Sequence, residues 1–264
     1  MITHLSEWAK RKPQAPFFCV QGEKQSIEYS YRRAHIAAAA LARELERYGM
    51  TANGTLACTM YNGTELVLLS LAAAYGGYTL ALLNPRLSAD ERQLRLVELE
   101  NATGEHGMDV LTNQMVNRLL IDATGFDATG FGLLPDDAAV LTRLQVELEQ
   151  TVQRYQERFD GDNAGLVMFT SGSSGTPKAA FLTWNSLMGS AAGANEVLRY
   201  EEHGVWQMVL PLCHVGGFQI LVRTLLSGNT FIAYERYQPQ RILNDVFSFR
   251  VTHISVVDKI LADL

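Results

Sequence analysis

The sequence predicts an α/β fold in which mostly parallel sheets are flanked by helices. Apolar stretches of strand length alternate with longer amphipathic or alanine-rich stretches along most of the chain, as in sheets whose parallel strands are connected by helices. Hydrophobic residues make up 47% of the 264 residues and charged residues 19%, which indicates a packed core. The length exceeds that of a typical single domain. We expect two α/β subdomains, 1–160 and 161–264, the first of which includes a loop-rich connector.

Turn and capping residues mark the elements of the first hundred residues. Pro13 closes a short amphipathic helix that begins near Leu5, and Ser30 can cap a long alanine-rich helix that stops at Gly49. A capping-box pattern starts a further helix at Ser88. The other elements expected here are strands at 16–20, 26–31, 55–61 and 78–83 and helices at 31–48, 65–75 and 88–100.

One uncharged stretch, residues 66–83, is long enough to be taken for a membrane span. Gly76 and Gly77 divide it, and glycines directly after a helix are a C-terminal capping signal. The part before them suits a buried helix and the part after them a buried strand, as a parallel sheet requires. We therefore expect a helix, a glycine turn and a strand here, and no membrane span.

Residues 101–163 carry the least informative pattern, because several glycines interrupt it. We expect a loop-rich connector with a short strand at 110–111, another short element at 115–121 and a helix at 141–159. The pattern becomes regular again afterwards. The later strands are expected at 165–169, 206–210, 230–234 and 252–257, and the helices at 184–198, 218–226, 239–249 and 259–264.

Composition argues against several classes of partner. The chain has 22 basic and 28 acidic residues, a net charge of −6, and no strong basic patch, so we expect no nucleic-acid partner. Cys19, Cys58 and Cys213 are widely spaced and odd in number, which favours a reducing cytosol over a disulfide framework and gives no metal-ligand spacing. The N-terminus has no apolar signal-peptide region. We therefore expect a cytoplasmic protein.

The stretch 164–183 carries the strongest chemical pattern. A run typical of a buried strand, 165–169, leads into a loop of small, hydroxylic and turn-forming residues that ends at Lys178. Backbone N–H groups, hydroxyls and an ammonium in such a loop can bind phosphate oxygens. The spacing is not that of a Walker A loop, and composition alone also allows a flexible surface loop. The candidate phosphate-binding residues are Thr170, Ser171, Gly172, Ser173, Ser174, Gly175, Thr176 and Lys178.

A second candidate cluster lies at residues 210–217. Pro211 closes a strand and Gly216 opens a helix, so His214 is expected at the carboxyl end of a strand, where ligands usually bind in α/β sheets. A histidine there can bond a phosphate or carboxylate oxygen, or it can merely satisfy a loop carbonyl. The residues alone leave both readings open. Arg223, on the helix that follows, is the nearest long cation.

Both patterns resemble signatures of the adenylate-forming acid–CoA ligase superfamily, the first over residues 170–178 and the second over 211–217. The resemblance implies the N-terminal large domain of such an enzyme, with ATP and Mg²⁺, coenzyme A as co-substrate and a small carboxylic acid as substrate. It implies adenylation of the carboxylate with release of pyrophosphate, followed by displacement of AMP by the coenzyme A thiol. Thr170 to Lys178 would then hold the β- and γ-phosphates, and His214 would be the catalytic residue beside the reacting carboxylate.

Among the subfamilies, the chain resembles the o-succinylbenzoate–CoA ligases of menaquinone biosynthesis. The ranges that carry this match are 214–217, 222–228 and 252–255. The match implies that His214, Gly216 and Gly217 contact the substrate and that Arg223 pairs with its second carboxylate. The alternatives are another acyl- or aryl-CoA ligase, or a non-catalytic nucleotide-binding fragment.

The resemblance also defines what these residues lack. The superfamily has a Tyr-Gly-x-[ST]-Glu signature whose glutamate helps hold Mg²⁺, a ribose-binding aspartate and a C-terminal domain with a catalytic lysine. None of these has a counterpart in the sequence. We therefore expect a catalytically incomplete N-terminal portion, leave the metal ligands unassigned, and expect a homo-oligomer formed through an unpaired sheet edge.

Overall fold

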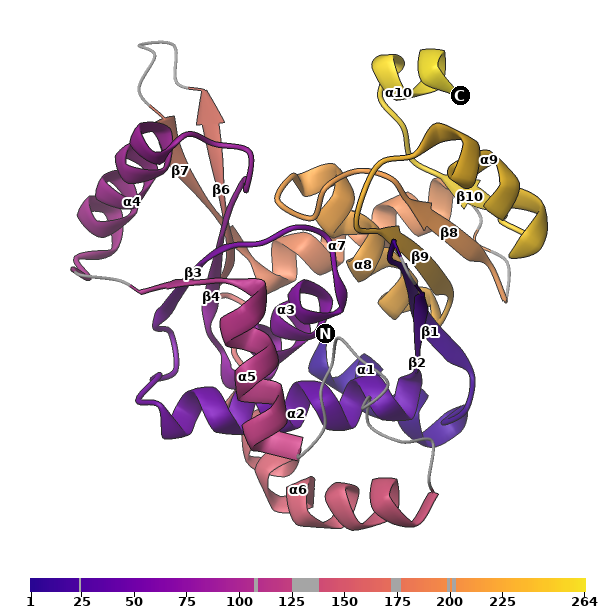
Figure 1. The fold of residues 1–264 in the computed structure, drawn as a ribbon. Helices are drawn as coiled ribbons and strands as arrows, with labels where there is room; N and C mark the ends of the chain where they lie inside the picture. Colours follow the sequence, from indigo (N-terminus) through magenta and orange to yellow (C-terminus); the bar gives the residue numbers. More distant parts are fainter. Residues whose placement is uncertain (24, 107–108, 125–137, 172–176, 199, 201–202) are drawn as a thin grey trace.

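The computed structural model describes residues 1–264 except 24, 107–108, 125–137, 172–176, 199 and 201–202. Within the described residues, the chain forms two five-stranded sheets with helices around and between them (Figure 1). Most neighbouring strands are parallel, and the two antiparallel pairs are hairpins. The predicted α/β fold class is confirmed.

The first sheet has the strand order β10-β8-β9-β1-β2. Its strands are β1 (Pro16–Gln21), β2 (Ser26–Ser30), β8 (Val205–Met208), β9 (Thr230–Tyr234) and β10 (His253–Ile254). β1 and β2 form a hairpin, and β1 pairs in parallel with β9, so that strands far apart in the sequence are adjacent. Phe18 stacks on Tyr29 of β2 and on Phe231 of β9, with ring centroids 4.9 and 5.6 Å apart. These aromatic contacts across three strands stabilise the register.

Helices cover both faces of this sheet. Successive residues of a strand point to opposite faces: Phe231 joins the main core, whereas Ile232 packs in a separate cluster with Ile242 of α9 (Pro239–Ser248). On the main-core side, α8 (Val215–Ser227) packs against β8 and β9.

The second sheet has the order β5-β3-β4-β6-β7. Its strands are β3 (Thr55–Thr59), β4 (Thr79–Leu83), β5 (Val110–Leu111), β6 (Ala164–Ser171) and β7 (Pro177–Thr183). β6 is parallel to β4 and antiparallel to β7. The remaining helices are α1 (Ile2–Arg11), α2 (Tyr31–Arg47), α3 (Thr64–Gly76), α4 (Ala89–Thr103), α5 (Asn113–Thr124), α6 (Ala138–Arg158), α7 (Trp184–Leu198) and α10 (Asp258–Asp263).

The burial of α3 explains the uncharged stretch at 66–83. Every residue of this helix is buried, α2 packs along it, and it ends at Gly77 in the left-handed conformation with φ of 70°. A fully buried leucine contributes ~1.5–3 kcal/mol, so an apolar sequence suits a helix inside the core. Among the helices described, none is long and apolar enough to cross a membrane.

Some elements differ from the sequence-based expectation. The short element expected at 115–121 is a longer helix, α5, over residues 113–124, because Val116 and Leu120 bury one face of it at helical spacing. Residues 125–137 of the connector lie outside the described part. Residues 177–183 form the second strand of a hairpin, and β10 has only two residues instead of the expected six. β10 lies at the edge of the described sheet and pairs with β8 alone, so no second neighbouring strand stabilises a longer strand there.

Each sheet combines strands from both sides of residue 160. β1 and β2 join β8, β9 and β10, while β6 and β7 join β3, β4 and β5. The two sheets are therefore not built from contiguous halves of the chain. The division into subdomains 1–160 and 161–264 stays a prediction about folding units.

Candidate active site at the strand ends

The carboxyl ends of four parallel strands, two from each sheet, meet at one place. A cavity of about 130 Å³ and an adjoining one of about 720 Å³ lie there and share several residues. The smaller cavity is lined by Met60, Tyr61, Asn62, Asn84, Pro85, Arg86, Val209, Pro211, Cys213, His214, Tyr234, Glu235 and Tyr237, which lie at the ends of β3, β4, β8 and β9. Ligands of α/β sheets bind at this edge, so we take it as the candidate active site.

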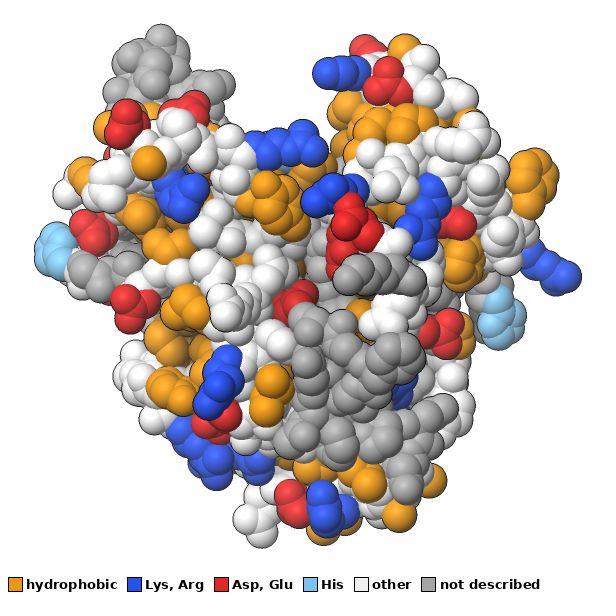
Figure 2. Space-filling model, viewed as in Figure 1, with side chains coloured by type: hydrophobic (Ala, Val, Ile, Leu, Met, Phe, Trp, Pro, Cys, Tyr) orange, Lys and Arg blue, Asp and Glu red, His pale blue; other side chains and the backbone are white. Residues whose placement is uncertain are grey.

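The surface is also hollowed on this side of the molecule. Figure 2 shows a notch between the part that carries β6, β7 and α4 and the part that carries α9 and α10. Such a concave surface between two parts of a fold is a common location for small-molecule sites.

Asn62 connects the two halves of the site. It follows β3 of the second sheet, and its Nδ2 donates to Leu210 O at 3.2 Å while its Oδ1 accepts from Leu212 N at 2.9 Å. Both leucines belong to the turn that follows β8 of the first sheet. His214 N donates to Pro211 O at 3.0 Å within the same turn. Asn62 therefore positions the segment that ends in His214.

His214 is the N-cap residue of α8 and is exposed. Its carbonyl accepts from Gly217 N and Phe218 N, both at 3.0 Å, and these bonds start the helix. Its side chain forms no capping hydrogen bond and lines the smaller cavity. The geometry brings His214 to the strand ends, and its catalytic role stays a prediction.

The two glycines after His214 have different surroundings. A Cβ atom at Gly217 would meet Pro211 O at 2.2 Å and Leu210 O at 2.7 Å, so only glycine lets the helix approach the turn this closely. Among the described residues, a Cβ atom at Gly216 would meet only the end of the Leu210 side chain, at 3.1 Å. Gly217 thus has a packing role beside the site. Contact of Gly216 and Gly217 with the substrate stays a prediction.

The predicted phosphate-binding stretch is the tip of the β6–β7 hairpin. Thr170 and Lys178 face each other across the hairpin, both are exposed, and Thr170 Oγ1 donates to Lys178 O at 3.5 Å. Val167 of β6 lies opposite Ala81 of β4, so β6 extends past the carboxyl end of β4. Lys178 therefore lies on the side of the sheet where the parallel strands end, which is the side of the candidate site.

Gly172, Ser173, Ser174, Gly175 and Thr176 lie outside the described residues, as does the side chain of Ser171, whose backbone ends β6. Their binding of phosphate stays a prediction from the sequence.

Arg223 lies apart from the residues that line the two cavities. It follows His214 by nine positions, about 13 Å along α8, and its guanidinium carbon is 5.9 Å from the Trp206 ring centroid. Burial raises the pKa of Tyr200, and the Arg223 charge opposes this increase. Trp206 stacks on His253, with centroids 4.7 Å apart. Arg223 is thus part of an aromatic cluster on β8.

Sequence reasoning gave no role to Asn62 or Arg86, although both follow strand ends, which was the available signal. Arg86 lines both cavities. Burial raises the pKa of the Cys213 thiol to about 11, and a backbone hydrogen bond and the Arg86 charge oppose this increase only in part. Arg86 is therefore a cation close to the turn that carries His214.

The described residues offer no evident metal centre. No group of three or more His, Cys, Asp or Glu side chains among them could hold a metal ion. Cys19, Cys58 and Cys213 are buried and free of disulfides. The metal ligands that the sequence left unassigned stay unassigned.

Curated relatives of the chain include 2-succinylbenzoate–CoA ligases of Staphylococcus aureus. The ligase of strain JH9 is 27% identical over 239 residues, which cover 88% of this chain and 48% of the relative. The ligase of strain MRSA252 is 26% identical with the same coverage. The chain spans about half the length of the curated relatives it matches.

Solved structures share the fold of this chain, as their TM-scores show. The o-succinylbenzoate CoA synthetase (MenE) of Bacillus subtilis, in complex with the acyl-adenylate intermediate OSB-AMP, has a TM-score of 0.74 and 22% identity, over 98% of this chain and 62% of that one. The N-terminal domain of FACL13 from Mycobacterium tuberculosis has a TM-score of 0.77 and 18% identity, over 99% and 63%. The family model of AMP-binding enzymes matches residues 5–264. The chain belongs to the AMP-binding enzyme family.

Proposed function

We propose that the protein to which these residues belong is an ATP-dependent acid–CoA ligase of menaquinone biosynthesis with o-succinylbenzoate as its acid. The observation that carries the proposal is the cavity formed by four strand ends, with His214 and Arg86 in its wall. Lys178 lies on the same edge of the second sheet. The 27% identity to ligases of this acid supports the choice of substrate.

The hairpin tip suits a triphosphate. Lys178 offers an exposed ammonium, a donor that phosphate oxygens accept. The exposed Thr170 hydroxyl, which donates to Lys178 O, would donate to phosphate after rotating away from that oxygen. MenE of Bacillus subtilis has been solved with ATP and magnesium, which supports ATP as co-substrate. Magnesium would neutralise phosphate charge, but the described residues supply no ligand group for it, and we assign it none.

His214 and the start of α8 suit the reacting carboxylate. A helix N-terminus favours an anion, and the imidazole can donate to a carboxylate oxygen. In the proposed reaction a carboxylate oxygen attacks the α-phosphorus of ATP and pyrophosphate leaves. The sulfur of coenzyme A then attacks the acyl carbon, and AMP leaves as the thioester forms. The residues of this chain would position the anions and offset their charge.

Two arginines are candidates for the second carboxylate of the acid. Sequence reasoning selects Arg223, which packs against Trp206. Arg86 lines the cavity together with His214 and is the second candidate. A charged hydrogen bond from either would contribute ~1.5–3 kcal/mol.

We also propose that the protein is cytoplasmic. We further propose that it self-associates through the outer side of β10. Ile254, Val257 and Leu261 in this region are 39%, 52% and 64% exposed, and an unpaired edge strand with apolar neighbours invites pairing. Light scattering should give the mass of a dimer or larger species for residues 1–264. The mass of a monomer at all concentrations would refute self-association.

Pyrophosphate exchange tests the reaction class. The full-length protein, supplied with ATP and a panel of aryl and acyl acids, should exchange pyrophosphate into ATP most efficiently with o-succinylbenzoate. Preference for a different acid would indicate another acyl- or aryl-CoA ligase, and exchange with no acid would indicate a non-catalytic nucleotide-binding module. Release of ADP instead of AMP would indicate a kinase-like ATPase. Residues 1–264 alone should show no turnover, and turnover by them would refute the proposed need for further segments.

A further inference from the structure

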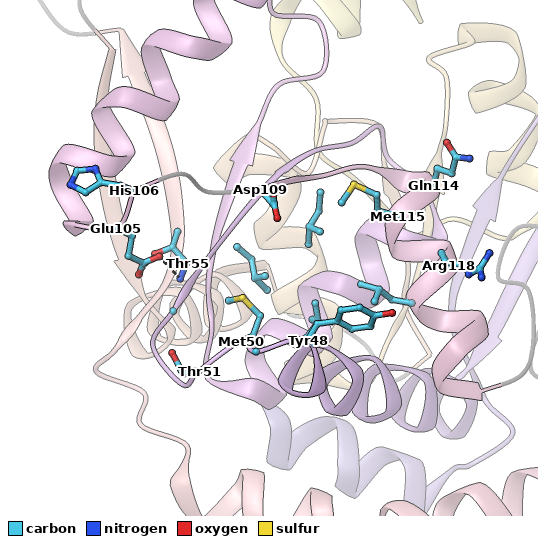
Figure 3. A pocket seen from close by; sticks show the side chains of 16 residues that line it. Tyr48, Met50, Thr51, Thr55, Glu105, His106, Asp109, Gln114, Met115 and Arg118 are labelled. Atoms are coloured by element: carbon cyan, nitrogen blue, oxygen red, sulfur yellow. Dashed lines mark hydrogen bonds between the residues drawn. The ribbon is translucent and has the colours of Figure 1, made fainter.

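A further cavity, larger than the two at the strand ends, lies at the opposite end of β3. It has a volume of about 980 Å³ and opens between the end of α2, the start of β3, the residues Glu105, His106 and Asp109, and α5 (Figure 3). Thr55 and Leu56, the first residues of β3, form part of its wall, whereas Asn62, after the other end of β3, lines the candidate active site. At ~3.3 Å per residue, the β3 residues of the two sites are about 20 Å apart, whereas the two sites come close at the start of α5, where Asn113 lines the larger strand-end cavity and Gln114 lines this one.

The floor of this cavity is apolar and belongs to the core. Leu45 and Leu56 are almost fully buried, and Met50 packs against the same core cluster. Met115, on α5, is 42% exposed and points toward the cavity from the opposite side (Figure 3). Methionine side chains adapt their shape to a ligand, and a volume near 1,000 Å³ is at the upper end for drug-sized ligands.

The rim of the cavity carries more negative than positive charge. Both oxygens of the Glu105 carboxylate are fixed by Thr55, whose N and Oγ1 each donate to one of them at 3.2 Å, and each oxygen can still accept another donor. Asp109 is exposed and forms no hydrogen bond or ion pair within the described part of the chain. The positive side chain at the rim, Arg118, pairs with Asp122 outside the cavity at 3.5 Å.

We propose that this cavity is a second binding site, for a small amphipathic amine whose apolar body packs between Met50 and Met115 and whose ammonium lies at Asp109. Charge complementarity selects the cation: the rim offers Glu105 and Asp109 to a donor, while the Arg118 guanidinium already has an anionic partner. The proposal does not depend on the reaction that the protein catalyses.

Two fluorescent probes of matched shape test the proposal on residues 1–264 and on the full-length protein. Dansylcadaverine carries a naphthalene body and an ammonium, and N-butyldansylamide carries the same body without charge. We expect saturable binding of both, with the cation preferred about two- to five-fold, the range for an exposed ion pair. Asp109→Asn should reduce that preference, because only the Glu105 carboxylate then remains for the ammonium. Met115→Lys, which replaces apolar surface by a like charge, should weaken dansylcadaverine about ten-fold or more.

Matched controls separate the site from general effects. Asp90→Asn removes an exposed carboxylate from the first turn of α4, outside the cavity, and should leave binding of both probes unchanged. Thermal unfolding of each variant should match that of the parent chain. Three results would overturn the proposal: no saturable signal up to about 1 mM probe, equal affinity for the two probes, or unchanged binding in folded Met115→Lys. Pyrophosphate exchange is not a readout of this experiment, so its outcome is independent of the proposed function.

Discussion

Replacing Asn62 by alanine removes two hydrogen bonds that join the second sheet to the turn after β8. The bonds have lengths of 3.2 Å to Leu210 O and 2.9 Å to Leu212 N. Each bond contributes ~0.5–1.5 kcal/mol net. We therefore expect the free energy of unfolding of residues 1–264 to fall by about 1–3 kcal/mol. Each kcal/mol should lower Tm by roughly 2–4 °C.

The same substitution should affect catalysis, because the turn ends in His214. Displacement of a positioned group by about 1 Å can lower a rate up to about 100-fold, and we expect kcat/KM for adenylation to fall about ten-fold in the full-length protein. Asn62→Asp keeps an acceptor for Leu212 N and loses the donor to Leu210 O, so its effect should be intermediate.

Urea unfolding and pyrophosphate exchange measure the two effects of the Asn62 substitution. For the unfolding measurement, Asn84→Ala is the matched control, because Asn84 Oδ1 accepts from Arg86 N at 2.9 Å within its own loop and joins no second element through that bond. It should cost less stability than Asn62→Ala. If Asn62→Ala changed unfolding by less than about 0.5 kcal/mol and left exchange unchanged, the two bonds would not position the turn.

Four further changes have defined outcomes. Lys178→Ala should lower adenylation in the full-length protein with unchanged Tm, because the side chain is exposed; a lower Tm with normal activity would make the lysine structural. Gly217→Ala should destabilise the chain by ~1–3 kcal/mol in urea unfolding and Gly216→Ala by less, since only the former brings a Cβ against backbone oxygens; equal effects would contradict this. Arg223→Ala should raise KM for the acid about ten- to a hundred-fold, and unchanged kinetics would remove Arg223 from the site. Burial lowers the pKa of His35 to about 4, so its neutral form is favoured in the folded state. The contribution of neutral His35 to the free energy of unfolding is fully present above its unfolded pKa near 6.5. This contribution falls as pH decreases toward 4, by up to about 3 kcal/mol. Urea unfolding at pH 7 and 4.5 should show a smaller loss in His35→Gln, and an equal loss would refute the assignment.

Local signals in the sequence determined much of the fold. Ser88 and Glu91 form the predicted capping box, with Glu91 N donating to Ser88 Oγ and Ser88 N donating to Glu91 Oε2. The glycine turn between α3 and β4 is also as predicted, with Gly77 in the left-handed conformation. Capping and turn geometry depend on residues within about one helical turn. A single sequence therefore carries them.

The position of His214 at a strand end could also be predicted, because a strand, a proline turn and a helix follow one another there. The family resemblance rested on the same residues and on 170–178, and the match to AMP-binding enzymes over residues 5–264 agrees with it. The sequence by itself thus determined the fold class, the family and one wall of the candidate site.

Only the tertiary structure decided which distant segments complete that site. The bonds of Asn62 to the turn before His214 span 148 and 150 positions of sequence, and no local pattern encodes them. The strand order that brings β1 beside β9, the placement of Arg86 in the cavity and that of Arg223 against Trp206 have the same origin. They depend on how buried faces pack against each other across the whole chain, and that packing is settled by all the core residues together.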